Sequence, residues 1–169
     1  MQERNRKRRR AGLIFPAIAL LLATAAGPAP AAAAGAFAGL DGAWSGDGAV
    51  KLTDGSTAKL RCRAVYSVSG GGDHLDQSID CANGAQSFAF RIALDQTDGA
   101  ILGFWRELTK QVEGGVSGQA APGKLQLVAR AQGFTAQATV VTRGARQTLA
   151  IAASGGGLSA VSIALRRGK

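Results

Sequence analysis

Apolar and polar residues alternate with a period of two through most of the sequence after residue 42. This period is typical of β-strands that bury one face and expose the other to water. The alternating segments are 44–52, 60–68, 87–94, 124–130, 134–140 and 161–165. Because no helical period persists for more than one turn in this region, the pattern predicts an all-β fold.

Short glycine-containing turns separate the alternating segments at intervals of roughly 8 to 16 residues. Examples are Asp54-Gly55, Asn83-Gly84, Asp98-Gly99 and Arg143-Gly144. The spacing indicates eight to ten strands, each paired with its neighbour in the chain. Closing such a meander removes its two unpaired edges. We therefore predict an antiparallel up-and-down barrel of about eight strands, with a flattened β-sandwich as the alternative.

The first 34 residues follow a different pattern. Six basic residues precede an apolar run (11–26), and alanines fill the last positions (31–34). A charged start, an apolar centre and small residues at the end are typical of a secretory signal peptide. The run of about 16 residues contains Pro16 and is shorter than the roughly 20 that a spanning helix needs. We predict cleavage of this segment and export to the periplasm or the extracellular space, leaving an N-terminal arm (35–41) and one barrel domain (42–169).

Export would remove much of the net positive charge. The whole chain has 20 basic and 11 acidic side chains and a formal charge of +9. Without the six basic residues and Glu3 of the first 34, the totals are 14 and 10, so the charge is about +4. This excess favours either an anionic envelope partner or simple solubility. Because the remaining basic residues are not interleaved with aromatic ones, we expect no nucleic-acid partner.

The chain has two cysteines, Cys62 and Cys81. In an oxidising compartment two such residues most simply form a disulfide. A metal site would need further ligands, and the chain has a single histidine, His74. We therefore predict a structural disulfide, with neither a metal nor a cofactor.

Both ends of the predicted barrel carry residues that resemble the calycins, the group of lipocalins, fatty-acid-binding proteins and avidins. Gly42-Ala43-Trp44 opens the first strand, and Arg166-Arg167 closes the last. The resemblance implies that Trp44 lies at the closed end of the barrel, crossed by an arginine of the last strand. Alternation with Val161, Ile163 and Leu165 turns Arg167 inward, so we assign it this role.

Further segments resemble a group of small secreted bacterial β-barrel proteins without an established activity. They are Asp54-Gly55, Arg61-Cys62-Arg63, Cys81 and the G-x-W-x-E segment 103–107. The resemblance covers nearly all of residues 40–167 and implies a fold rather than a ligand.

Aromatic residues on the predicted inward faces are the candidates for a ligand site. They are Trp44, Tyr66, Phe88, Phe90, Trp105 and Phe134. Such side chains would line a pocket for a small apolar ligand, or else form the core of the barrel. Glu107 lies on the same strand face as Trp105. We expect its carboxylate at the rim, or paired with a base such as Arg91, because a buried unpaired carboxylate is costly.

No motif predicts an enzyme. His74, near Asp73 and Asp76, is a candidate general base, but a lone loop histidine is usually solvated. Segment 118–124 fits G-x-x-x-x-G-K, yet Leu125 stands where a phosphate-binding loop needs Ser or Thr. We therefore assign no catalytic residue.

Together these features predict an exported, non-enzymatic protein that binds a small apolar ligand or an envelope component. The alternative is a protein-interaction module that acts through its N-terminal arm or its loops. The order of arm, G-x-W and two cysteines resembles the small periplasmic inhibitors of bacterial metalloproteases, in which the segment before the barrel enters the protease. Residues 35–41 would have that role here.

Overall fold

The computed structural model describes residues 34–168, so the predicted signal peptide lies outside the described residues except for Ala34. Ten antiparallel strands follow one another in the chain. Their bounds are β1 (Gly42–Leu52), β2 (Thr57–Ser69), β3 (His74–Ala82), β4 (Ser87–Thr97), β5 (Ala100–Glu107), β6 (Val112–Ala121), β7 (Lys124–Ala131), β8 (Phe134–Arg143), β9 (Arg146–Ser154) and β10 (Leu158–Arg167).

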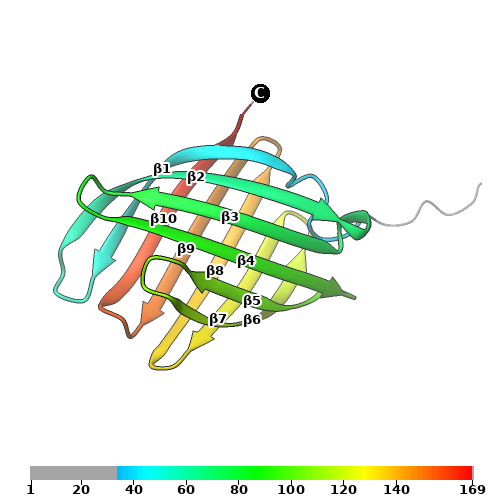
Figure 1. Ribbon diagram of the computed structural model, residues 1–169. Coiled ribbons are helices and arrows are strands. Elements are labelled where there is room, and N and C mark those ends of the chain that lie inside the picture. The colour runs from blue at the N-terminus through cyan, green and yellow to red at the C-terminus, as the bar shows by residue number, and fades with distance from the viewer. Residues whose placement is uncertain (1–33, 169) are drawn as a thin grey trace, which may run out of the picture. The chain divides into compact units, whose positions relative to one another are not determined.

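The strands close into one barrel, because β1 pairs with β10 as well as with β2. Each of the strands β2–β9 pairs with its two neighbours in the chain. Figure 1 shows β1–β4 crossing in front of the wall formed by β7–β10. The predicted all-β barrel is confirmed, with ten strands, the upper limit of the predicted range. None of the described residues forms a helix long and apolar enough to cross a bilayer.

The two ends of the barrel differ. Because the strands alternate in direction, odd-numbered strands begin and even-numbered strands end at the same side. Residues 34–41 and the 3-10 turn η1 (Gly70–Gly72) lie there, and we call this the closed end. The opposite end, the mouth, consists of five turns: 53–56, 83–86, 108–111, 132–133 and 155–157.

The N-terminal arm, residues 35–41, packs into the core of the barrel. Phe37 is 0% exposed and belongs to the same buried cluster as Trp44. The Phe37 amide donates to the carbonyl of Gly72 at 2.9 Å, and the Gly35 amide donates to that of Gly71 at 3.1 Å. The arm forms a plug in which burial of Phe37 and Leu40, together with these hydrogen bonds, opposes the entropy lost on ordering a glycine- and alanine-rich segment.

Inward-facing glycines let the backbones of adjacent strands approach one another closely. Gly46 on β1 faces inward, and a Cβ added there would lie 1.9 Å from the carbonyl oxygen of Ala164 on β10. Any larger residue would therefore push apart the two strands that close the barrel.

Cys62 and Cys81 form the predicted disulfide between β2 and β3. The two residues lie directly opposite in the register and both face inward, where Cys62 is fully buried. Residues 34–168 form a closed barrel around a hydrophobic core of their own, which is typical of a domain that folds independently.

Reducing the disulfide should lower stability. The bond closes a loop with a sequence separation of 19, for which loop entropy in the unfolded chain gives about 3 kcal/mol. Urea unfolding of residues 34–169 with and without a thiol reductant measures the difference. An unchanged midpoint after complete reduction would contradict this expectation.

Phe37→Ala should lower the free energy of unfolding by about 3–5 kcal/mol, because it empties a buried site in the core. Phe104→Ala is the matched control: Phe104 is 74% exposed, so its loss should change stability by no more than about 0.5 kcal/mol. Urea unfolding of both variants decides whether the arm is part of the fold. Equal effects would show that it is not.

Candidate ligand-binding site

Inward-facing side chains differ in how completely they are buried. Near the closed end Trp44 and Leu165 are each 2% exposed, whereas Val140 and Leu149 in the same half are half-buried. Towards the mouth, inward-facing apolar side chains of several strands are only half-buried although they lie inside the barrel: Phe88, Phe90, Ala129, Phe134, Ile151, Ala153 and Val161. Apolar surface therefore stays accessible inside the mouth half.

Three aromatic rings from different strands meet in the mouth half. The centroid of Trp105 on β5 lies 6.4 Å from that of Phe90 on β4 and 5.7 Å from that of Phe134 on β8. Since β5 and β8 are not neighbours in the barrel, the second contact crosses the interior. The structure thus brings together three of the candidate aromatic residues, Phe90, Trp105 and Phe134.

A glycine on the neighbouring strand leaves room for the indole ring of Trp105. Its ring is 8% exposed, and its indole N–H has no acceptor among the described residues. Gly114 lies opposite on β6, and a Cβ there would come within 2.9 Å of Nε1 of Trp105. The indole can occupy this position only because β6 has no side chain there.

Tyr66 belongs to the closed end rather than to this aromatic cluster. Its hydroxyl donates to Oε1 of Gln147 at 2.5 Å and accepts from Nε2 of Gln77 at 3.0 Å. Gln147 in turn donates to the hydroxyl of Thr142 at 3.0 Å. Burial raises the pKa of Tyr66 well above its usual value, so the phenol stays neutral. The resulting polar layer joins β2 and β3 to β8 and β9 across the interior.

The seam between β1 and β10 lies next to this polar layer. Cζ of Arg167 lies 4.7 Å from the centroid of the Trp44 ring, a cation–π distance. The Trp44 indole donates to the carbonyl of Leu40 at 2.8 Å, and Arg167 donates to that of Gly39. Both side chains thus hold the arm as well as the seam.

The carboxylate of Glu107 binds backbone amides at the turn that follows β5. Its side chain is 5% exposed and accepts hydrogen bonds from the amides of Ala89 (3.2 Å), Thr109 (3.0 Å) and Lys110 (2.5 Å). Burial alone would raise the pKa of Glu107, but these hydrogen bonds outweigh it and lower the pKa. The expected pairing with Arg91 is wrong, because Arg91 faces outward and pairs with Asp80 at 3.3 Å.

His74 lies on the outer wall, where carboxylates hold both ring nitrogens. Nδ1 lies 2.7 Å from Asp95 and Nε2 lies 3.1 Å from Asp76. The hydrogen bond with Asp95, and then that with Asp76, raises the pKa of His74. The imidazole is therefore a bridge between β3 and β4 rather than a free base.

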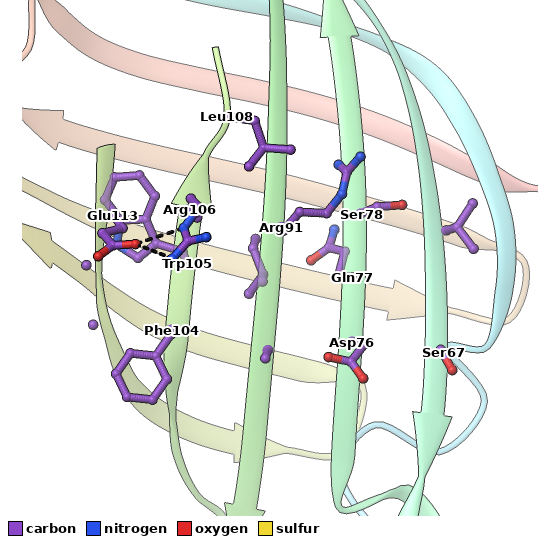
Figure 2. Close-up of a pocket in the computed structure, with 15 residues that line it drawn as sticks. Ser67, Asp76, Gln77, Ser78, Arg91, Phe104, Trp105, Arg106, Leu108 and Glu113 are labelled. Atoms are coloured by element: carbon purple, nitrogen blue, oxygen red, sulfur yellow. Dashed lines mark hydrogen bonds and ion pairs between the residues drawn. The ribbon is translucent and has the colours of Figure 1, made fainter. Parts of the chain in front are cut away.

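A shallow concave surface crosses the outside of β2–β6 (Figure 2). Phe104 projects outward there and is flanked in the register by the small residues Ala93 and Gly115. Nearby, Arg106 pairs with Glu113 at 2.6 Å, as the dashed lines in Figure 2 mark. This open surface, most of whose accessible area is apolar, is the second place where an apolar group could bind.

No protein-family model matches the sequence, and no curated protein matches it by sequence. Solved structures do share its fold. Rv2717c from M. tuberculosis has a TM-score of 0.61 and 13% identity, covering 78% of this chain and 94% of its own. The S-type phycobiliprotein lyase CPES from Guillardia theta has a TM-score of 0.60 and 8% identity, covering 79% and 90%. Both are calycin-like β-barrels, so the likeness shows the fold and no ligand.

Replacing Glu107 by Gln should cost about 1.5–3 kcal/mol of stability at neutral pH, because the buried amides lose a charged acceptor. The folded-state pKa is lowered, so the contribution is complete above the unfolded pKa near 4.3 and is lost as pH falls through the folded pKa. Urea unfolding at neutral and acidic pH should show the difference between wild type and variant shrinking in acid. Glu113→Gln, on the outer face, should have little effect at either pH. A constant penalty for Glu107→Gln would contradict this interpretation.

Proposed function

We propose that the protein is an exported, non-enzymatic carrier that binds a small apolar ligand inside the mouth half of the barrel. The observation that carries this proposal is the half-buried state of inward-facing apolar side chains around Phe90, Trp105 and Phe134. In a filled small barrel such side chains would be buried against one another. Accessible apolar surface enclosed by strands is what an apolar ligand would cover.

The titratable side chains support a role without catalysis. Glu107 is saturated by backbone amides, and both nitrogens of His74 are held by carboxylates. Neither group has a free position from which to move a proton to or from a ligand. The buried Cys62–Cys81 disulfide supports export, since such bonds persist in oxidising compartments.

The alternative of an inhibitor acting through residues 35–41 has less support. Entering a protease cleft would require Phe37 to leave the core and the arm to break its hydrogen bonds with η1. The cost of emptying the Phe37 site would weaken any such complex.

Titration with the neutral apolar dye N-phenyl-1-naphthylamine tests the proposal. Ala138 faces inward on β8, half-buried between Leu127 and Ile151, so Ala138→Phe should fill the interior. We expect dye affinity to fall by about tenfold or more, equal to roughly 1.4 kcal/mol. Gln137→Phe puts the same ring on the outer face next to it and should leave the affinity unchanged.

Two further variants keep the outcome readable. Circular dichroism shows whether Ala138→Phe folds. If it does not, Ala153→Leu takes its place, because it adds bulk inside the barrel from β9 and should also weaken dye binding. Phe104→Ser removes the outer aromatic ring and should have no effect. If the dye does not bind, or if only Phe104→Ser weakens it, the interior is not the binding site.

A further inference from the structure

The charged side chains are divided unequally between the two halves of the barrel. All ten acidic residues of the predicted mature chain lie between residues 35 and 113. Residues 114–168, which include β7–β10, contain no acidic residue and six basic ones. These are Lys124, Arg130, Arg143, Arg146, Arg166 and Arg167. One continuous wall of the barrel is therefore purely basic.

Three of these arginines are direct neighbours across the strands. Arg143 on β8 lies opposite Arg146 on β9, which lies opposite Arg166 on β10. All three are exposed and face outward, whereas Arg167 faces the interior. With strands about 4.8 Å apart, the row is about 10 Å long. Lys124, at the start of β7, lies beside the same row. We call these four residues the basic rim.

The basic rim is not explained by the fold itself. Like charges directly opposite one another in an antiparallel sheet are destabilising. Within residues 34–168, none of the four side chains is in an ion pair, whereas Arg61, Arg91 and Arg106 on the other wall each pair with an acid. The row therefore opposes folding unless an anion lies over it.

We infer that the basic rim binds the phosphate groups of an anionic phospholipid surface. Its charge is complementary to such a surface, and no acidic side chain of its own wall opposes the contact. Of the acidic residues at the closed end, Asp73 and Asp95 lie on the β3–β4 side, and Asp98 lies in the turn after β4. Asp41, just before β1, accepts a hydrogen bond from the Val68 amide at 3.1 Å. The bilayer would thus meet the β7–β10 side of the closed end.

The basic rim lies at one end of the barrel. The strand ends that carry all four residues belong to the closed end. This surface lies outside the barrel and is independent of any ligand within it.

Vesicle co-sedimentation of residues 34–169 tests the inference. Phosphatidylcholine vesicles containing one-third phosphatidylglycerol should bind the protein at low salt, and pure phosphatidylcholine should not. The triple variant Arg143→Gln, Arg146→Gln and Arg166→Gln should weaken binding on the order of 100-fold. The matched control Arg61→Gln, Arg91→Gln and Arg106→Gln removes the same charge from the other wall and should change binding by only a few-fold.

Thermal unfolding without vesicles gives a second readout. If the row has no structural role, the basic-rim variant should unfold at the same or a higher temperature than the wild type, because like charges have been removed. Three results would overturn the inference: equal losses in both triple variants, no binding to anionic vesicles, or binding of free polyphosphate without binding of vesicles. The last would assign the rim to a soluble phosphate compound.

Discussion

The pairing of β1 with β10 is the interaction on which the rest of the structure depends. Every other strand pair joins neighbours in the chain, and without this one the ten strands would form an open sheet with two edges. The seam is reinforced where it meets the closed end. Arg167 stacks on Trp44 across it, and both side chains bind carbonyls of the arm. The closure of the barrel and the cover over its end therefore depend on the same two side chains.

This closure divides the interior into two parts with different chemistry. At the closed end the plug, the Trp44–Arg167 stack and the polar layer from Gln77 to Thr142 fill the interior. Among the described side chains there, Nε of Arg167 is the buried polar atom without a hydrogen-bond partner. Towards the mouth the inward-facing side chains are mainly alanines, valines and phenylalanines that do not bury one another fully. The first part specifies the shape of the barrel, and the second leaves apolar surface free.

Much of the barrel follows from residues that are close together in sequence. Alternation identifies the inward faces, the parity of β10 turns Arg167 inward, and the two cysteines lie on adjacent strands. Long-range partners left no such signal. The Tyr66–Gln147 hydrogen bond joins residues 81 apart, and nothing in either segment distinguishes them.

Glu107 and Phe37 show two other limits of the sequence. Alternation correctly places Glu107 inward. It does not reveal that backbone amides of the following turn donate hydrogen bonds to the Glu107 carboxylate. Phe37 stands alone in a segment without period, so no pattern tells a free arm from a plug. The decisive partners of Glu107 are main-chain amides, and those of Phe37 are core side chains distant in the sequence; no local pattern marks either.

The closed ring also constrains the order in which the protein folds. The Cys62–Cys81 bond spans 19 residues, while the contact of Arg167 with Gly39 spans 128, so the first loop closes at a smaller entropic cost. A topology completed by such a distant contact folds slowly. Until β10 is available, β1 and β9 present unpaired edges that other chains can extend. A chain shortened by its last strand would therefore be an aggregation-prone sheet rather than a smaller barrel.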